Sequence, residues 1–555
     1  MTDRPRVRLN QLGYLPNGPK HATWVTDLAR AAPFAVHDRD GTVVLRGESR
    51  PWPHRPDPSS GQSVHVLDLT ALTTAGPGYH VVAGADRSHP FGIGADLYAA
   101  VGRDAFRLFY LLRSGCPIDE ERAPGYGRPA GHPGDAAVPA WTGPDADRLY
   151  PGWHPAGVFD VSGGWYDAGD YGKYVVSGGI ALWQLLHLLR LLRRHPAAGG
   201  TVPLAEVVEE CRWQLDWLLR MQVPAGQPLA GMAFHRVHGT EWSPMPGWPH
   251  RDPTTRVLHR PSTAATLHLA AVAAQAARLL GDDDPAYAER LLTAARTAYR
   301  AARARPDLIA PDDKGRFGGG PYGDPDVTDD FGWAGTALWL ATGDDEYRTG
   351  SAAFHPDGFH PDGFDFDRVS GPAALDLATA GGPAGRVRDA ADRLIRLQRD
   401  QPWGQPYAPP DGWAWGSNGR ILNNLVVLAI AHELTGAETF RDATAEGMDY
   451  LLGRNALGQS YVTGYGTDAT RHLRTRQFGH DLDPAMPPPP PGALAGGANS
   501  LPTPGWPPDP RLAGRPPQCC YLDEPTSETT NDICIRWNAP LAYVAAYLTL
   551  TGAAA

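Results

Sequence analysis

The sequence has no surplus of basic residues. Its 555 residues include 50 Lys and Arg against 61 Asp and Glu, a formal net charge of −11 that is spread along the chain. Nucleic acids and anionic membrane surfaces attract clustered positive charge, which this chain does not provide. We therefore expect neither nucleic acid nor a membrane as a partner.

Cysteines are few and follow no pattern. The five of them, an odd number, have no C-x-x-C spacing, which argues against a disulfide framework and suits a reducing compartment. The N-terminus also lacks an apolar stretch behind a basic start, which a secretory signal would have. Both absences predict a cytoplasmic protein, or a secreted one if a signal has been removed.

Long uninterrupted apolar runs are missing as well. The longest apolar segment, residues 174–194, contains Gln184, His187 and three arginines. Polar groups at these positions predict an amphipathic helix and not a membrane span.

Glycine and proline are present in excess. The 64 Gly and 55 Pro make up 119 of the 555 residues, or about 21%, against roughly 12% in average proteins. A hydrophobic content of 42% and 17 Trp are too high for a disordered chain. The composition therefore predicts a globular protein with many shaped loops. Residues 481–520 hold 13 prolines and are expected to form a long loop.

The texture of the sequence changes near residue 95. Up to about residue 94, short apolar runs such as HATWV (21–25) and SVHVLDL (63–69) alternate with turn residues, which predicts a small all-β sandwich. Beyond it, apolar residues recur every three or four positions in about a dozen segments, many ended by Gly or Pro. These segments predict a large helical domain without significant strand content, either a closed toroid of helical hairpins or a stacked bundle.

One segment of the helical part carries two close carboxylates. GGWYDAGDYGKYVV (163–176) places Asp167 and Asp170 three residues apart among aromatic residues. If the chain turns there into the start of a helix, both carboxylates face the same side. Two carboxylates aimed at one point can polarise a water molecule, and the aromatic rings offer apolar faces for sugar rings. The structural alternative is an N-cap aspartate with a neighbour.

This segment resembles the catalytic-base segment of glycoside hydrolase family 9, the inverting cellulases. VRLNQLGYLPNGPKHATWV (7–25) is similar to the immunoglobulin-like domain that precedes the barrel in one branch of that family, and RWNAPLAYVAAYL (536–548) is similar to its closing helix. The resemblance extends over nearly the whole chain. Further similar stretches are 258–271, 320–334, 415–436 and 448–467.

The resemblance implies a mostly α fold, with an immunoglobulin-like β-sandwich over 1–95 and an (α/α)6 barrel over 96–555. It implies an inverting glycoside hydrolase that cleaves β-1,4-linked glucan chains or oligosaccharides and needs no cofactor for the chemistry. By position, Asp170 matches the base that activates water, and Asp167 matches the residue that helps to hold that water. Inverting enzymes keep the carboxyls of base and acid roughly 6.5–9.5 Å apart, which leaves room for the water.

The sequence departs from the family at the acid. The family has a glutamate before its closing helix, and the matching residue here is Asp532. An aspartate withdraws the carboxyl by about 1.5 Å, and a misplacement of about 1 Å can cost on the order of 100-fold in rate. Glu528 stands where the family usually has an aromatic residue and is an alternative acid, unless it is a solvated loop carboxylate. Glu524 is a more remote candidate, and Asp523 is expected to hold the closing loop through hydrogen bonds.

A second departure concerns the family's His-x-Arg signature, whose side chains bind sugars near the cleavage point. The corresponding residues here are Arg474 and Arg476. Arginine is permanently charged and binds carboxylates and phosphates. Arg474 therefore favours either an acidic or modified sugar, or an ion pair with Asp468 or Asp481 away from substrate.

These departures keep two alternatives open. One is an intracellular, exo-acting or modified-sugar glycosidase with an altered acid site, in which the 481–520 loop blocks one end of the cleft. The other is a catalytically weakened relative that only binds carbohydrate. The intact pair Asp167 and Asp170 argues against a pure binder.

Aromatic residues on the family's cleft side are candidates for stacking on sugar rings. Any single one is as readily a core residue, so the group carries the prediction. The candidate platforms are Trp242, Trp333, Trp415, Tyr465 and Tyr166.

Metal sites are weakly indicated, and the metal is unknown. Some relatives hold zinc with two Cys and two His before the carboxylate segment, whereas here that stretch has only Cys116, His132 and His154. The Asp-rich loops 323–330 and 281–287 supply oxygen ligands of the kind that a structural Ca²⁺ prefers, without EF-hand spacing.

Overall fold

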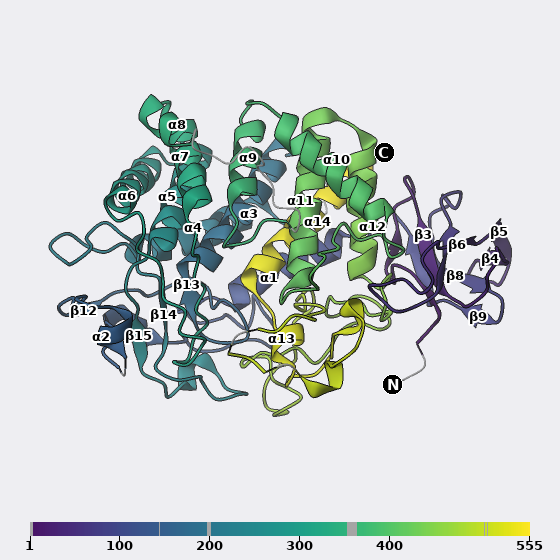
Figure 1. The fold of residues 1–555 in the computed structure, drawn as a ribbon, viewed down its shortest axis with the longest axis horizontal. Coiled ribbons are helices and arrows are strands. Elements are labelled where there is room, and N and C mark those ends of the chain that lie inside the picture. Colours follow the sequence, from purple (N-terminus) through teal and green to yellow (C-terminus); the bar gives the residue numbers. More distant parts are fainter. Residues whose placement is uncertain are drawn as a thin grey trace.

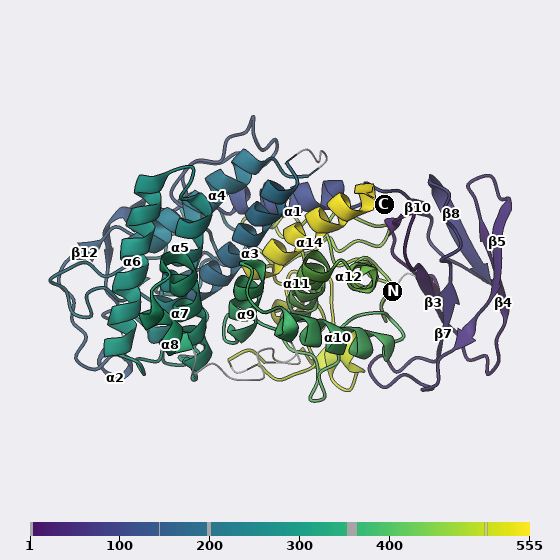
Figure 2. The same ribbon diagram turned by 90° about the horizontal axis from the view of Figure 1, so that it is seen from above.

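The computed structural model describes residues 4–143, 145–196, 201–351, 363–503, 505–507 and 509–554. Strands fill the N-terminal part at one end of the molecule, and helices make up most of the rest (Figure 1 and Figure 2). The last N-terminal strand ends at Ile93, and helix α1 begins at Ala99.

The N-terminal part contains two sheets around a common core, as the alternating runs predict. One sheet has the order β1 (Val7–Arg8), β3 (His21–Val25), β7 (Val64–Asp68), β6 (Arg50–Pro51). The other has the order β2 (Gly13–Tyr14), β10 (Phe91–Ile93), β8 (Gly76–Ala83), β4 (Pro33–His37), β5 (Val43–Glu48), with β9 (Asp86–Arg87) paired to β8. Trp24, Val36, Leu67 and Val81 are buried in the core that these strands share.

Six helices of the C-terminal part pack in a cycle. They are α3 (Val175–Arg194), α5 (Thr263–Leu280), α7 (Thr328–Thr342), α9 (Ser370–Thr379), α11 (Ser417–Thr435) and α14 (Ile535–Ala554). Each contacts the next in this order, and α14 contacts α3. Helices α3, α5 and α11 are buried nearly all round, because apolar residues occur on every face of each helix.

A second set of helices packs outside this cycle. It consists of α1 (Ala99–Leu111), α4 (Leu204–Arg220), α6 (Pro285–Ala304), α8 (Asp345–Ser351), α10 (Gly385–Arg399) and α12 (Glu438–Leu451). Among other contacts, α1 packs on α14, α4 on α3, α6 on α5, α8 on α7, and both α10 and α12 on α11. Their outer faces are polar, which is the amphipathic pattern expected of helices with one buried side.

Helix α3 is not the amphipathic surface helix that its polar residues predict. Among the described residues it is the one helix long and apolar enough to cross a membrane, yet 94% of that window is buried inside the fold. Its polar groups are bonded internally: Gln184 donates to Asn423 (2.6 Å), and Arg190 pairs with Glu433 (3.0 Å). Buried polar groups need such partners, so the prediction was wrong about the helix face.

The helical part also contains short strands, contrary to the expectation of no significant strand content. A three-stranded antiparallel sheet joins β13 (Lys173–Tyr174), β14 (Arg236–Gly239) and β15 (Arg256–Leu258), and β11 (Val138–Pro139) pairs with β12 (Val158–Phe159). Strands of two to four residues are too short to show alternation. Because β13 lies within the carboxylate segment, shortly after Asp170, this sheet fixes the position of that segment.

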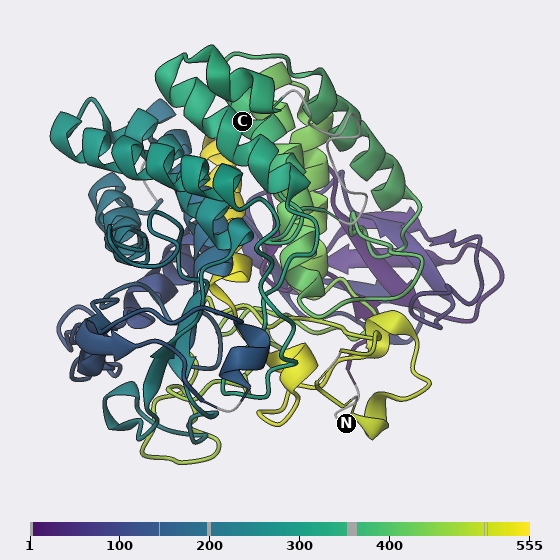
Figure 3. The same cartoon turned by 60° about the vertical axis from the view of Figure 1, so that its left-hand side comes forward.

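Loops gather at one end of the helices, on the lower side of Figure 1 and Figure 3, together with the short strands. The proline-rich segment 481–520 is irregular where described, as predicted, apart from 3₁₀ turns at Pro510–Leu512 and Pro517–Cys519. Gln518 ties it to the N-terminal part through Ser59, whose carbonyl accepts from the Gln518 backbone N–H (2.9 Å) and whose hydroxyl lies 2.6 Å from the Gln518 Nε2. The short helix α13 (Glu528–Asn531) follows just before α14.

Candidate active site

Asp167 is buried between α3 and the start of α14. Ser177 and Tyr322 each donate a hydrogen bond to its carboxylate, both at 2.5 Å. Its backbone carbonyl accepts from the Ile535 N–H (2.8 Å). Burial raises the pKa of Asp167 to about 6, although the two hydroxyl donors act to lower it. The Cys534 thiol also lies 3.6 Å from the Asp167 Oδ1. A carboxylate has about four acceptor positions, so these three partners leave one of them unused.

Asp170 is partly exposed and lies three residues further along the same loop. Its Oδ2 accepts from the Gly172 N–H (2.9 Å) and from the Tyr174 hydroxyl (3.1 Å). No described residue donates a hydrogen bond to its Oδ1. One oxygen is therefore fixed by the protein, and the other is left for a water molecule.

Asp532 lies between α13 and α14, against the same loop. Its Oδ1 accepts from the Gly169 N–H at 3.0 Å. Loss of water around the carboxyl raises the pKa of Asp532 to about 8; the Arg474 guanidinium opposes this shift, and the charge of Asp170 adds to it. At neutral pH the carboxyl of Asp532 keeps its proton, whereas ordinary aspartates have lost theirs.

Backbone pairing joins the segment that carries Asp167 and Asp170 to the segment that carries Asp532. Ala168 forms a β-bridge with Cys534 on one side, and Arg474 forms a parallel bridge with Asp532 on the other. A Cβ atom at Gly169 would lie only 2.3 Å from the Arg474 carbonyl oxygen and 2.7 Å from the Asp532 Oδ1. The close approach of these segments therefore requires glycine at position 169.

Arg474 and Glu528 bind each other. The Arg474 Nη2 and the Glu528 Oε1 form a close ion pair, and the Arg474 Nη1 donates to the Pro525 carbonyl (3.2 Å). Glu528 is thus not a free solvated carboxylate, and its charge is engaged by Arg474.

The partners suggested for Arg474 by the sequence are occupied elsewhere. Asp468 pairs with His89 (2.7 Å), and Asp481 pairs with His472 (2.8 Å). The expectation of an internal ion pair holds, but those two partners were wrong. Sequence separation hid the true partner, because Glu528 comes close only when α13 packs against the 470–476 segment.

Asp523 binds the start of the 470–476 segment, whereas the closing loop was the expected partner. Its carboxylate accepts from the Thr470 hydroxyl (2.6 Å) and from the backbone N–H groups of Arg471 and His472 (3.0 Å each). Glu524, the remote acid candidate, is bound by Arg511 at 2.8 Å.

Three tryptophans from separate loops form a chain of ring contacts. Trp506 lies edge-on to Trp242, with ring centroids 6.4 Å apart, and edge-on to Trp415, with centroids 5.3 Å apart. Trp242 is 39% exposed. Trp506 was missed from the sequence because it lies in the proline-rich loop, which has no periodic pattern.

Comparison with known proteins identifies the family of this chain. A family model described as Glycosyl hydrolase family 9 matches residues 98–545, and one described as Cellulase N-terminal ig-like domain matches residues 2–88. The chain belongs to glycosyl hydrolase family 9. The resemblance inferred from the carboxylate segment is confirmed, as is the immunoglobulin-like N-terminal domain.

Relatives of this family 9 chain include an endoglucanase and a cellobiosidase. Endoglucanase C of Cellulomonas fimi is 46% identical over 99% of this chain and 52% of its own length. The cellulose 1,4-beta-cellobiosidase of Acetivibrio thermocellus is 36% identical over 98% of this chain and 67% of its own length. The solved structure of a Bacteroides ovatus family 9 protein matches with a TM-score of 0.83 at 28% identity, over 99% of both chains. The chain spans about half the length of the Cellulomonas fimi relative.

Several residues expected to bind sugar in this family 9 chain lie elsewhere. Trp333 and Tyr166 are fully buried, and the Tyr166 hydroxyl bonds the His132 ring (2.7 Å). The Tyr465 hydroxyl donates to Asp104 on α1 (2.6 Å), so its ring does not join the tryptophan chain. The assignments of Trp333 and Tyr166 were wrong because a motif match fixes the position along the chain and not the direction of the side chain, whereas the assignment of the half-buried Tyr465 stays a prediction.

Arg476 lies behind the site and not on its surface. It is 4% exposed, and it donates to the carbonyl oxygens of Gly169 (3.0 Å) and Ser243 (2.9 Å). Its guanidinium also lies 5.7 Å from the ring centre of Trp242. The expected sugar contact is replaced by support of the carboxylate loop.

The three candidate zinc ligands do not converge. His132 uses both ring nitrogens, one toward Tyr166 and the other toward Asp252 (3.0 Å). His154 is exposed, and Cys116 is free. Among the described residues they form no common site.

One acidic cluster does have the form of a cation site. Oxygens of Asp324, Asp329 and Asp330 lie within 4.8 Å of one another. The Oδ2 oxygens of Asp324 and Asp330 are buried without a hydrogen-bond partner, while the His268 Nε2 lies 3.4 Å from the Asp330 Oδ1. Burial and mutual repulsion raise the pKa of Asp324 to about 9 and that of Asp330 well above its usual range. Two unpartnered carboxylate oxygens in a group of three aspartates fit a hard cation such as Ca²⁺.

The second Asp-rich loop, 281–287, has another role. Asp284 caps α6 by accepting from the Tyr287 N–H (3.0 Å) and pairs with Arg212 (2.8 Å). Its neighbour Asp283 pairs with Arg193. These carboxylates are already neutralised by the protein.

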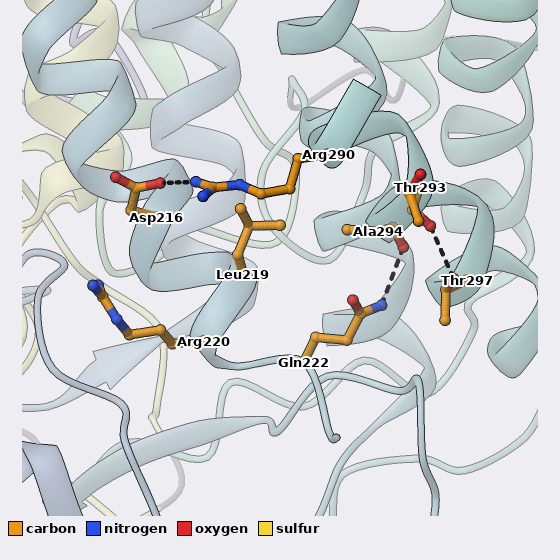
Figure 4. Close-up of a pocket in the computed structure, with 8 residues that line it drawn as sticks. All are labelled: Asp216, Leu219, Arg220, Gln222, Arg290, Thr293, Ala294 and Thr297. Carbon is orange, nitrogen blue, oxygen red and sulfur yellow. Dashed lines mark hydrogen bonds and ion pairs between the residues drawn. The ribbon is translucent and has the colours of Figure 1, made fainter. Parts of the chain in front are cut away.

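A pocket of about 480 Å³ lies between α4 and α6, away from this site (Figure 4). Arg290 pairs with Asp216 in it (2.6 Å), and Gln222 donates to the Ala294 carbonyl (3.1 Å). It contains no aromatic ring and none of the three carboxylates, so it is not the candidate active site.

Proposed function

We propose that this protein is an inverting glycosidase that hydrolyses β-1,4-linked glucan chains or oligosaccharides. The observation that carries the proposal is the contrast between Asp532, whose raised pKa keeps it protonated at neutral pH, and Asp170, which has one oxygen free for water. A pair of carboxyls with separated proton affinities is the arrangement that acid–base chemistry requires. The names of the relatives, an endoglucanase and a cellobiosidase, support the substrate class.

In the proposed mechanism, water attacks the anomeric carbon from the side opposite the leaving oxygen. Asp170 takes a proton from this water, and Asp167 helps to hold it in place. The glycosidic carbon–oxygen bond breaks while Asp532 gives its proton to the departing oxygen. A single displacement of this kind inverts the anomeric centre, and the two carboxyls must then stand roughly 6.5–9.5 Å apart.

The helices support the (α/α)6 barrel that this chemistry uses in the family. Six helices packed in a cycle, with six others outside them, correspond to its inner and outer rings. The catalytic loops then lie at one mouth of the barrel. We place the domain boundary near residue 95, between the last strand of the sandwich and α1.

We propose the tryptophan chain as the sugar platform. Trp242 and Trp415 would stack on apolar faces of glucose units, and Trp506 braces both. Because the charge of Arg474 is already taken by Glu528, the interpretation as an acidic-sugar enzyme loses its main support.

A structural Ca²⁺ fits the cluster of Asp324, Asp329 and Asp330. Asp329 also accepts from the backbone N–H groups of Val369 (2.6 Å) and Ser370 (3.1 Å) at the start of α9. A cation there would join the loop before α7 to α9. The hydrolysis itself needs no cofactor, and its partner is the carbohydrate substrate.

An exo-acting enzyme is the second candidate. Trp506 belongs to the long 481–520 loop and contacts tryptophans from two other loops, which supports a cleft that is closed at one end. A purely carbohydrate-binding relative has less support, since binding alone does not call for a protonated Asp532 beside Asp170.

The proposal is tested with cellulose, soluble β-glucans and short cello-oligosaccharides as substrates. We expect hydrolysis by the wild type and its loss in Asp170→Asn, with products followed by chromatography. Oligosaccharide turnover that far exceeds polymer turnover, with cellobiose as the main product, would favour the exo-acting form. A folded wild type that hydrolyses none of these substrates would refute the proposal.

A further inference from the structure

Arg474 lies near two acidic residues, Glu528 and Asp532. Its backbone pairs with that of Asp532 through a parallel bridge, and the Arg474 N–H donates to the Asn531 carbonyl (2.9 Å). The backbone of Arg474 is therefore held beside Asp532. Only the direction of its guanidinium can change.

Glu528 fixes that direction. It forms the ion pair with Arg474 Nη2, while the Pro525 carbonyl accepts from Nη1. Glu528 is the first residue of α13, and Asp532 is the residue that ends it. One helical turn thus carries both the partner of Arg474 and the proposed acid. The pair is partly shielded, with side chains 20% and 35% exposed.

We propose that Glu528 is a positioning residue for the acid: it binds the Arg474 guanidinium and so keeps that charge off the Asp532 carboxyl, which retains the proton for the leaving oxygen. This inference rests on the proposed function. Glu528 stands where the family usually has an aromatic residue, and Arg474 stands where it has a histidine. The proposal explains why these two departures occur together, because each side chain neutralises the charge of the other.

The groups that act on Asp532 come from three elements. Arg474 on the 470–476 segment lowers its pKa, and Asp170 on the carboxylate loop raises it. The backbone N–H groups of Gly169 on that loop and of Ile533 next to Asp532 donate to the carboxyl and also lower its pKa. An unpaired cation within about 4–6 Å lowers the pKa of a carboxyl by about 1–3 units. Without Glu528, the charge of Arg474 would be unpaired on a segment that is bridged to Asp532, and the acid would lose its proton near neutral pH.

The first test is the pH dependence of kcat on an unactivated cello-oligosaccharide. For Glu528→Gln we expect the basic limb to move to lower pH by about one unit or more. The double variant Glu528→Gln/Arg474→Gln should return this limb to the wild-type position or above. Arg474→Gln alone should move it to higher pH, because Glu528 then adds a second negative charge. Glu524→Gln is the matched control, since it breaks another Glu–Arg pair in the same loop, and it should leave the limb unmoved.

The second test needs no turnover. Each protein is compared with its own Asp532→Asn version by thermal unfolding across pH. Asp532 has a raised pKa, so the stability due to its proton is complete below its ordinary value of 3.8 and is lost as pH rises to about 8. We expect the difference from Asp532→Asn to level off near pH 8 in the wild type and at lower pH in Glu528→Gln.

The outcomes separate the two proposals. If Glu528→Gln lowers kcat while neither pH curve moves, Glu528 is only a structural residue and the inference fails. If Arg474→Gln moves the basic limb to lower pH, the charge of Arg474 does not favour loss of the proton from Asp532, and the inference fails. If the wild type does not hydrolyse glucans but the unfolding curves shift as described, the function fails and the role of Glu528 stands.

Discussion

Replacing Gly169 with alanine should disable the site without unfolding the protein. The new Cβ would lie 2.3 Å from the Arg474 carbonyl oxygen and 2.7 Å from the Asp532 Oδ1. An ordinary carbon–oxygen contact is about 3.3 Å, so the two segments must separate by about 1 Å. Both belong to the backbone bridges that fix Asp170 and Asp532 relative to each other.

The magnitude follows from this displacement. A misplacement of about 1 Å costs on the order of 100-fold in rate, which is about 2.7 kcal/mol in activation free energy. The buried Asp167 and its hydroxyl donors are not touched, so binding of water at that carboxylate should survive. We therefore expect the loss mainly in kcat.

The assay measures kcat and KM on a soluble cello-oligosaccharide, with thermal unfolding as the check of folding. Gly385→Ala is the control, because an added Cβ at this exposed helix position meets nothing within 4 Å. A Gly169→Ala protein that keeps its unfolding temperature and works within threefold of wild type would refute the account of how the carboxyls are held.

Three further predictions concern the acid, the platform and the acidic cluster. Asp532→Asn should reduce turnover most on substrates with poor leaving groups and least on activated aryl glycosides, and equal losses on both would remove Asp532 as the acid. Trp506→Ala should raise KM for oligosaccharides about 3- to 10-fold, because the stacking support is worth about 0.5–1.5 kcal/mol; unchanged KM would exclude a platform role. Excess Ca²⁺ at about 100 times its Kd should stabilise the protein by about 2.7 kcal/mol over the EDTA-treated form. Calorimetry measures this difference in the free energy of unfolding. Asp330→Asn should abolish the difference, and a difference that persists would place the ion elsewhere.

Periodicity in the sequence predicts much of the fold. The alternating runs before residue 95 correspond to the two sheets, and the apolar residues at helical spacing correspond to the long helices. Inner and outer helices were not distinguished, because α3 carries polar residues that are bonded inside the protein. The strands β13–β15 were missed because too few residues form them for any period to appear.

The carboxylate loop could be predicted because its residues are close in sequence. The rest of the site depends on contacts between distant segments. The pair of Arg474 and Glu528 forms only after α13 packs beside the 470–476 segment, and Trp506 reaches its neighbours through an irregular loop. The motif also does not predict the direction in which a side chain points, as the burial of Trp333 shows.

The central claim is that Asp170 activates water while Asp532 protonates the leaving oxygen in one displacement. The most direct test uses NMR to follow which anomer is first released from a β-linked cello-oligosaccharide, before mutarotation brings the two anomers to equilibrium. The account predicts the α-anomer as the first product. Initial release of the β-anomer would mean retention of configuration and would contradict it.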